Sequence, residues 1–448
     1  EEVLTCLDAC PPAALHAHPM AILVLMRCMF NWRRIPEMLA LQGQFEAALA
    51  AQPSMPPAER DHLLGECDLI RSFLCYNDIS AMSRLHASAS ARMTRPAISI
   101  RNSGGWTFGS PSVLMMFHRT PGGLAQEQAE MDACMPHYYK ITDGHGRGAE
   151  QVMRAEAAFL QGRFCDAQIA LEQAYAQVGG NENMALCCDF LSRRLSLHTD
   201  VEQRYTFEER YAALLRCHDA SWINLWSATS AYYHALRGET DKIPEIFSQH
   251  RLSDINMLAP GKPMMEMIEN QVYLAQGAYA KVVGRSAELL AVCEAMHYAL
   301  VALHIRIQTA AAYERLGKSE EARAWLRKAL SDAEPDGLVM PFVENYDILK
   351  PLLEREVKND LLSKIIELGE AATARNAAGT RPAAFDVLTP REFEIVELMA
   401  QRLSNREIAE QLFLSEGSVK QYVNQIYSKL HIEGDTRTKR KLLAELLR

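Results

Sequence analysis

The chain has 448 residues, of which 48% are apolar and 23% charged, and its formal net charge is −9. This length exceeds one ordinary domain, and the composition is that of a folded globular protein, which excludes a largely disordered chain. A membrane span needs roughly 18 consecutive apolar residues, and no run in this sequence approaches that length. The eleven cysteines are scattered and form no C-x-x-C pair. The sequence therefore predicts reduced thiols in the cytoplasm, with no disulfide framework and no metal site.

A short pattern recurs along the first part of the chain: apolar residues, a glycine, and then a segment rich in alanine. The glycines are Gly43, Gly162, Gly238, Gly277 and Gly317, and the last two intervals are 39 and 40 residues. A glycine can adopt the left-handed conformation that ends a helix, and regularly spaced turns of this kind are typical of stacked helix pairs. Residues 1–368 are therefore predicted to form an all-α, TPR-like helical-repeat solenoid. The alternative is an irregular helical domain with coincidental turns.

Two segments interrupt this pattern. Residues 103–111 and the glycines at 122 and 123 are incompatible with continuous helix, and residues 137–148 are rich in aromatic residues, histidine and glycine. Aromatic and well-placed polar side chains commonly line ligand pockets. The candidate site for a small-molecule or peptide effector consists of Trp106, Phe108, Tyr138, Tyr139 and His145. The alternative is a long loop that packs over the solenoid.

Residues 369–386 lose apolar periodicity and end in glycine, proline and alanine, which predicts a linker between two separately folded units. The charge balance changes at the same point. Residues 387–448 carry ten Lys and Arg against nine Asp and Glu, a net charge of +1, so the preceding 386 residues carry −10. The C-terminal segment is thus electrostatically distinct from the acidic region before it.

Three helix starts follow one another closely in residues 387–448. Thr389 and Ser404 are each followed three residues later by glutamate, as in a capping box, and Ser415 begins a third helix. Only Phe413 and Leu414 separate the second helix from the third, which predicts a helix-turn-helix. The positions expected to face a common core are Phe393, Val396, Met399, Ala400, Leu403, Ile408, Ala409, Leu412, Val419, Val423, Ile426 and Leu430.

The third of these helices has a polar face away from its apolar stripe. The long polar side chains on this face are suited to base edges in a major groove, and they are Lys420, Gln421 and Asn424. The residues that flank them are suited to phosphate oxygens, and they are Ser418, Tyr422 and Lys429. An ordinary solvated face would carry both signs of charge. Residues 417–432 contain no carboxylate, which favours DNA as the partner of this face.

These residues resemble the LuxR/NarL-type helix-turn-helix family. The resemblance rests on Leu388-Thr-Pro-Arg-Glu-Phe393, Leu398, Ala400, Ser404-Asn-Arg-Glu-Ile-Ala409, Leu412, Leu414-Ser415, Ser418-Val-Lys420 and Ile426-Tyr-Ser-Lys-Leu430. It implies a four-helix unit at residues 387–448 whose third helix reads double-stranded DNA. The implied base contacts are Lys420, Gln421 and Asn424, and the implied DNA-backbone contacts are Asn405, Ser418, Tyr422 and Lys429. The fourth helix, residues 436–448, would pair two copies on DNA through Leu442, Leu443, Leu446 and Leu447.

Three positions depart from the pattern of this family: Arg402 stands in place of glycine, Tyr422 in place of histidine, and Gln425 in place of asparagine. The order of the two parts is similar to that of the MalT-like subgroup, in which a nucleotide-binding domain comes first. This sequence lacks such a domain and begins without methionine, so we expect an upstream part to be missing. Gly317-Lys318-Ser319 lacks the earlier glycine of a phosphate-binding loop. We expect no cofactor and no catalytic residues in this chain.

Together these features predict a bacterial-type, cytoplasmic transcription regulator that joins a helical-repeat sensor, a linker and a LuxR-type DNA-binding module. Its expected partners are double-stranded DNA, RNA polymerase, an effector and, on DNA, a second copy of the chain, with no membrane association. The alternative is a helical-repeat adaptor for a protein partner, with a weak or vestigial DNA-binding module. An enzyme is the third interpretation, and no catalytic motif supports it.

Overall fold

The computed structural model describes residues 2–102, 104–255, 257–379, 385, 387–401, 403–412, 414–432, 434–435, 438–439, 442–443 and 446. Over these residues the regular structure is helical, with no β-strand, which confirms the all-α prediction. None of the helices described is long and apolar enough to cross a membrane. The chain divides into two compact units, Glu1–Gly369 (unit 1) and Glu370–Arg448 (unit 2).

The α-helices of unit 1 are α1 (Glu2–Asp8), α2 (Pro12–His16), α3 (Pro19–Asn31), α4 (Ile35–Ala50), α5 (Pro57–Ser72), α6 (Ile79–Arg92), α7 (Val113–Phe117), α8 (Leu124–Ile141), α9 (Ala149–Leu160), α10 (Phe164–Val178), α11 (Glu182–Ser196), α12 (Phe207–Leu215), α13 (Ala220–Leu236), α14 (Glu245–Ser248), α15 (Lys262–Ala275), α16 (Tyr279–Met296), α17 (Ala299–Arg315), α18 (Ser319–Ala333), α19 (Met340–Val343) and α20 (Tyr346–Leu353). Short 3₁₀ helices are η1 (Phe73–Cys75), η2 (Thr240–Lys242), η3 (Leu252–Asp254), η4 (Ala259–Gly261) and η5 (Glu334–Asp336). Helix α21 (Asp360–Gly379) crosses into unit 2, where α22 (Pro390–Ala400), α23 (Asn405–Leu412) and α24 (Glu416–Lys429) follow.

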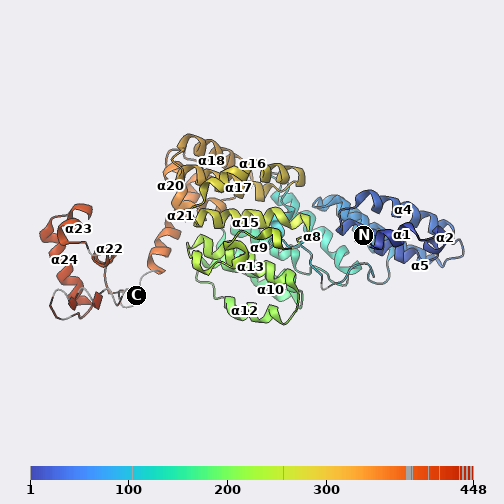
Figure 1. The fold of residues 1–448 in the computed structure, drawn as a ribbon, viewed down its shortest axis with the longest axis horizontal. Helices are drawn as coiled ribbons and strands as arrows, with labels where there is room; N and C mark the ends of the chain where they lie inside the picture. Colours follow the sequence, from blue (N-terminus) through green and yellow to red (C-terminus); the bar gives the residue numbers. More distant parts are fainter. Residues whose placement is uncertain are drawn as a thin grey trace. The chain divides into compact units, whose positions relative to one another are not determined.

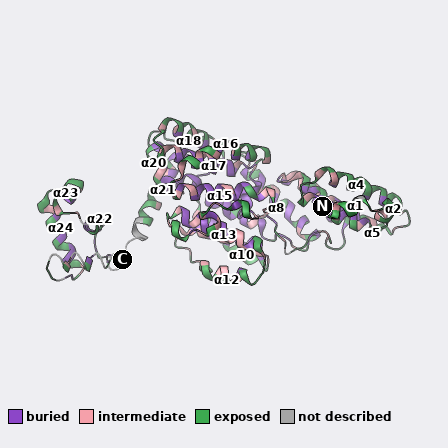
Figure 2. Ribbon diagram, in the orientation of Figure 1, coloured by how far each residue is buried: buried purple, intermediate pink, exposed green. Residues whose placement is uncertain are grey.

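Consecutive helices of unit 1 pack side by side in pairs, among them α3 with α4, α5 with α6, α9 with α10, α15 with α16, and α17 with α18. In Figure 1, α1, α2, α4 and α5 lie at one end of this unit, and α8 lies between them and the helices that follow it. Figure 2 shows that buried residues are frequent in α15 and α17, where most side chains are inaccessible to solvent. This architecture is compatible with a TPR-like solenoid, which stays a prediction.

The same turn ends α9, α13, α15 and α17. In each turn a glycine has a φ between 69° and 75°, and the next residue donates a backbone hydrogen bond to the carbonyl five residues before it. This Schellman arrangement satisfies carbonyls that a helix end leaves without partners. The four glycines are Gly162, Gly238, Gly277 and Gly317, so four of the five predicted turns are confirmed.

The predicted turn at Gly43 is wrong, because Gly43 lies in the middle of α4. Leu41 and Phe45 are four residues apart and are buried in the same hydrophobic cluster, so one helical face continues across the glycine. Burial of this face outweighs the roughly 1 kcal/mol that glycine costs in a helix interior. The turn between α3 and α4 is formed instead by Arg33, which takes a left-handed conformation with φ 58°.

Two predicted loops are partly helical. Residues 137–141 belong to α8, so only residues 142–148 form a turn, in which Gly144, Gly146 and Gly148 have positive φ. Residues 370–379, predicted as part of the linker, continue α21. This segment contains five alanines, the strongest helix former, so the missing apolar stripe marks an exposed helix and not a loop. Residues 380–384 and 386 of the predicted linker lie outside the described residues.

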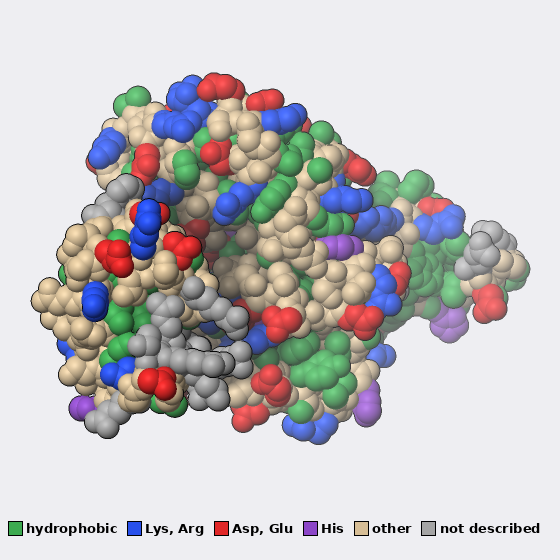
Figure 3. Space-filling view, turned by 60° about the vertical axis from the view of Figure 1, so that its left-hand side comes forward, with side chains coloured by type: hydrophobic (Ala, Val, Ile, Leu, Met, Phe, Trp, Pro, Cys, Tyr) green, Lys and Arg blue, Asp and Glu red, His purple; other side chains and the backbone are tan. Residues whose placement is uncertain are grey.

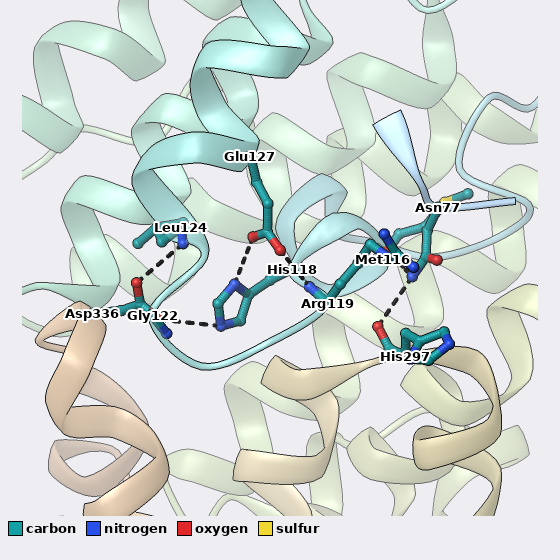
Figure 4. Close-up of polar contacts among 9 residues, drawn as sticks. All are labelled: Asn77, Met116, His118, Arg119, Gly122, Leu124, Glu127, His297 and Asp336. Carbon is teal, nitrogen blue, oxygen red and sulfur yellow. Dashed lines mark hydrogen bonds and ion pairs between the residues drawn. The ribbon is translucent and has the colours of Figure 1, made fainter. Parts of the chain in front are cut away.

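Polar contacts in unit 1 join segments that are more than 200 residues apart, as Figure 4 shows. Asn77 Nδ2 donates to the backbone carbonyl of His297 at 3.1 Å. The carboxylate of Asp336 accepts hydrogen bonds from the backbone N–H groups of Gly122 and, at 3.1 Å, of Leu124. A stack in which each repeat contacts only its neighbours does not require such contacts. These contacts connect early segments of unit 1 directly to late ones.

His118 connects to the second group of these contacts. Its Nδ1 is 2.8 Å from Glu127 Oε2, and its Nε2 is 3.6 Å from Asp336 Oδ2. The other oxygen of Glu127 accepts from the backbone N–H of Arg119 at 2.8 Å. Buried carboxylates are tolerated when donors surround them in this way. The network holds the segment between α7 and α8 against η5.

Candidate nucleic-acid interface

Three capped helices follow residue 388. Before α22, the Thr389 N–H donates to Glu392 Oε2 at 2.7 Å, and the Thr389 hydroxyl accepts from the Glu392 N–H at 3.3 Å. Ser404 and Glu407 exchange the same two bonds before α23, at 2.7 and 3.3 Å. Before α24, Ser415 Oγ accepts from a backbone N–H at 3.0 Å. These bonds satisfy N–H groups that a helix start leaves free, and they confirm the three predicted starts.

Apolar residues of the three helices meet in one core. Its buried members are Phe385, Leu388, Phe393, Ile395, Val396, Leu398, Met399, Ile408, Ala409, Val419, Val423, Ile426, Tyr427, Ile432 and Leu443. Leu403, Leu412 and Leu430 pack at its edge, whereas Ala400 is exposed. Helix α24 packs against both α22 and α23, as in a helix-turn-helix. One face of α24 is therefore fixed, and the other is left to solvent.

Two charged side chains connect the ends of these helices. Arg391 on α22 donates to the backbone carbonyl of Leu412, the last residue of α23, at 2.8 Å. Lys429 Nζ, at the end of α24, is 2.7 Å from Glu392 Oε2. Glu392 is only 3% exposed. Burial raises the pKa of its carboxyl, but hydrogen bonds from Lys429 and Thr389 outweigh burial and hold this pKa below its usual value.

The outer face of α24 is polar. The buried residues of this helix are Val419, Val423, Ile426 and Tyr427. At 3.6 residues per turn, Gln421, Asn424 and Ser428 project from the opposite side, and all three are exposed. Lys420 is exposed on one flank of this face. Glu416, in the first turn, is the only carboxylate of the helix, so the rest of the face offers hydrogen-bonding groups without repelling an anion.

The residues expected to contact phosphate differ in how far they are exposed to solvent. Ser418 and Tyr422 are half-buried, and the Ser418 hydroxyl is 2.8 Å from the capping hydroxyl of the same helix. Asn405 is the first residue of α23 and is also half-buried. The Lys429 side chain is 39% exposed and paired with Glu392. Contact of these residues with a DNA backbone stays a prediction.

Arg406, the second residue of α23, is a further candidate for phosphate contact that was not predicted from the sequence. Its side chain is 79% exposed and forms an ion pair with Glu410 at 3.2 Å, which is accessible to solvent as well. A surface pair of this kind is weak, so Arg406 can exchange its partner for a phosphate. The sequence feature that could have identified Arg406 is its position beside Asn405 at the start of the second predicted helix.

The predicted fourth helix is described in part. Leu447 lies outside the described residues, as does Arg402. Leu443 is 1% exposed and belongs to the core of unit 2, so its assignment to a seam between two copies is corrected. The reason is its position, since a residue that fills the module's own core has no surface left for a partner. Leu442 and Leu446 are each 39% exposed and stay the predicted contacts.

Comparison with known proteins places this interface in a family. The family described as "Bacterial regulatory proteins, luxR family" matches residues 386–440. The spore germination protein GerE of Bacillus subtilis is 37% identical over 62 residues, which are 14% of this chain and 78% of GerE. The chain belongs to the LuxR family of bacterial regulatory proteins.

Other relatives match this LuxR-family chain over the same part. The nitrate/nitrite response regulator protein NarL of Escherichia coli is 33% identical over 98 residues, 22% of this chain and 45% of NarL. The transcriptional regulatory protein LiaR of B. subtilis is 34% identical over 87 residues, 19% of this chain and 36% of LiaR. The chain thus spans less than half the length of these two relatives. The LuxR-type resemblance is confirmed, and the MalT-like subgroup stays a prediction.

The candidate effector residues of the LuxR-family chain lie in unit 1. Trp106, Phe108, Tyr138 and His145 line one cavity of about 40 Å³, so the two predicted segments do meet. His145 makes the link between them, because its Nε2 is 3.0 Å from the carbonyl oxygen of Gly104.

Tyr139 does not line this cavity. Its hydroxyl donates to Glu150, lies 3.2 Å from the Gly146 carbonyl oxygen, and accepts from the Gly148 N–H at 2.9 Å. Tyr139 points about 100° away from Tyr138 around α8, and its hydroxyl is held by the turn that follows the helix. Tyr139 instead fixes the turn after α8.

The surface charge of the chain is mixed. On the face that Figure 3 shows, Lys and Arg side chains are interspersed with Asp and Glu. Within the described part of the chain, no cluster of His, Cys, Asp and Glu could hold a metal ion.

Proposed function

We propose that this chain is a transcription regulator that binds double-stranded DNA sequence-specifically through α24, under the control of an effector bound in unit 1. The observation that carries the proposal is the outer face of α24, where Gln421 and Asn424 are exposed, Lys420 flanks them, and no carboxylate follows the first turn. A helix fits the major groove, where amide and ammonium groups can bond to base edges. Membership of the LuxR family supports this role.

Contacts to phosphate would hold α24 in the groove. Asn405 and Ser418 lie at the starts of α23 and α24, where the helix dipole favours an anion. Arg406 adds an exposed cation beside Asn405. Tyr422 and Lys429 complete the proposed backbone contacts.

Two copies would bind adjacent half-sites. Leu442 and Leu446 are exposed apolar residues in the described part of the last segment, and pairing through them would match the two-fold symmetry of a palindromic site. The regulator would act with RNA polymerase in the bacterial cytoplasm, where both lie. In this proposal, unit 1 responds to its effector, and the response reaches unit 2 along the chain.

Selection of duplexes from a random pool by the full chain tests the proposal. Fluorescence anisotropy should then show that the selected duplex binds at least about 10³-fold more tightly than random DNA. Binding should weaken steeply as salt rises, because phosphate contacts release counterions. Lys420→Ala should weaken binding to the selected duplex about 10- to 100-fold, the loss expected for about 1–3 kcal/mol of base recognition, with much less effect on random DNA.

Lys328→Ala is the matched control, because Lys328 is an exposed lysine of α18 whose ion pair with Asp332 lies in unit 1. It should change neither affinity. Equal weakening of selected and random DNA by Lys420→Ala would reassign Lys420 to the backbone. A chain that enriches no sequence at all would contradict the proposal and favour the protein-interaction adaptor.

A further inference from the structure

The cavity in unit 1 holds a positive charge that no sequence motif predicts. Arg27 of α3 lines it, together with side chains from η1, α6, α7 and α8. Among the described residues, no carboxylate lines the cavity and none forms an ion pair with Arg27. The Nε of Arg27 is buried without a hydrogen-bond partner.

The surroundings of Arg27 do not neutralise it. The central carbon of the guanidinium is 4.5 Å from the ring centroid of Phe73 and 5.9 Å from that of Phe30. Nη1 donates to the side-chain oxygen of Asn31, a neutral group. Aromatic rings and one amide replace only part of the hydration that the guanidinium has lost. Burial accordingly lowers the pKa of Arg27. An anion in the cavity would relieve this cost.

The two histidines of the cavity are uncharged at neutral pH. Burial lowers the pKa of His86 to about 3 and that of His145 to about 4. His145 Nε2 faces a carbonyl and must donate to it, so Nδ1 accepts from the Tyr138 hydroxyl at 2.7 Å. Arg27 is therefore the one charged group among the lining residues.

Most of the remaining cavity wall is apolar. Trp106, Phe108 and Phe117 contribute aromatic surface, and four methionines line the space between them. Two of these, Met131 and Met135, lie on α8. Methionine side chains are flexible and can repack around a guest larger than the present volume of about 40 Å³.

We propose that this cavity binds a small carboxylate with an apolar body, such as an arylacetate or a short fatty acid. The carboxylate pairs with Arg27, and the apolar part lies among the aromatic rings and the methionines. The regulatory role of this ligand rests on the proposed function, because α8 packs against both α6 and α9 and a guest beside Met131 and Met135 alters that packing. Binding itself does not depend on that role.

Thermal unfolding of the full chain with phenylacetate, its neutral analogue phenylacetamide, and acetate tests the proposal. A ligand that binds only the folded protein raises Tm. At about 10 mM, phenylacetate should raise the Tm of unit 1 by about 2 °C or more, and the other two probes should have little effect. Arg27→Met should abolish this shift, whereas Arg163→Met, which removes an exposed arginine paired with Asp166, should keep it.

Arg27→Met removes a poorly compensated, partly buried charge, so the Tm of this variant without ligand should equal or exceed that of the unsubstituted chain. Phenylacetate should also change the tryptophan fluorescence, and Trp106→Phe should remove that change. An equal response to phenylacetamide, a shift that survives in Arg27→Met, or no shift with any probe would each overturn the proposal. None of these measurements involves DNA, so their failure is distinct from a failure of DNA binding.

Discussion

At the scale of single residues, Glu392 both caps a helix and forms an ion pair. It completes the capping box with Thr389, and it holds Lys429 at a distance of 2.7 Å. Its carboxyl is nearly buried, yet its pKa lies below the usual value because the bonds from Lys429 and Thr389 outweigh burial. A carboxyl with a lowered folded-state pKa stabilises the fold above its unfolded-state pKa of about 4.3 and loses that contribution as pH falls through the lowered value.

Glu392→Gln should therefore destabilise unit 2 by about 1 kcal/mol at pH 7, since it keeps the hydrogen-bonding shape and removes the charge. The difference between the two proteins should be constant above about pH 5 and should shrink as the pH falls below about 4. Differential scanning calorimetry of the full chain across this range measures it. Glu410→Gln is the control, because Glu410 is 67% exposed and its pair with Arg406 should contribute almost nothing. A Glu392→Gln effect that persists undiminished at low pH would show that the pair with Lys429 is not its source.

At the scale of elements, three glycines with similar neighbouring residues have different roles: Gly43 lies within a helix, whereas Gly162 and Gly277 each form the turn that ends one. Gly43 is helical, with no atom within 4 Å of the position that a Cβ would occupy. Gly277 has equal space but a φ of 75°. Gly162 has a φ of 69° and is crowded as well, because a Cβ there would lie 2.6 Å from Leu368 Cδ1 and 3.1 Å from Val339 Cγ2.

We expect Gly43→Ala to stabilise unit 1 by up to about 1 kcal/mol. Gly277→Ala should destabilise it by about 1–2 kcal/mol through the left-handed backbone alone, and Gly162→Ala by more, because crowding is added. Urea unfolding followed by tryptophan fluorescence reports this order, since all five tryptophans precede residue 369. Destabilisation by Gly43→Ala would contradict the helical assignment of that position.

The last segment of unit 2 gives a matched pair of leucines. Leu446→Glu should weaken binding to a duplex with two half-sites about 10 base pairs apart while leaving a single half-site unaffected, because Leu446 is accessible to a second copy. Leu443→Ala should weaken both equally, since loss of a buried leucine costs about 2–5 kcal/mol of folding stability. Anisotropy with the two duplexes measures each effect. If Leu446→Glu weakened binding to both duplexes equally, Leu446 would not belong to a contact between two copies.

Local signals explain which elements were predictable. The caps at Thr389, Ser404 and Ser415 were found because the residues that exchange bonds are three positions apart in the sequence. The turn at Arg33 was missed because left-handed backbone is uncommon for a residue other than glycine, so the sequence carries no signal for it. The role of Arg27 was not predicted either, because Arg27 and Trp106 line the same cavity but are almost 80 residues apart in the sequence. A local sequence pattern cannot indicate a contact of that range.

At the scale of the whole molecule, one buried ion pair connects distant parts of unit 1. Arg194 of α11 donates to both oxygens of Glu344, at 2.7 and 3.0 Å, and the Tyr232 hydroxyl donates to the same carboxylate at 2.9 Å. The side chains of Arg194 and Glu344 are 3% and 0% exposed. Removal of one partner from such a pair leaves an uncompensated charge in the interior.

Glu344→Gln should therefore destabilise unit 1 by about 3–5 kcal/mol, measured by urea unfolding. Glu172→Gln, which breaks an exposed pair with Arg204, should change stability by less than about 1 kcal/mol. Similar losses from the two variants would mean that the interior pair is weaker than its geometry implies.

The contacts of Asp336 with the segment at Gly122 and Leu124 have a consequence for how the protein is made. These partners are 214 and 212 residues apart, and a ribosome adds about 5–20 residues per second, so the earlier segment waits roughly 10–40 s for its carboxylate to be synthesised. During that interval the helices already synthesised lack part of their final packing, and their apolar surfaces are open to chaperones or to other nascent chains. Unit 1 thus completes its folding late, shortly before α21 and the DNA-binding helices leave the ribosome.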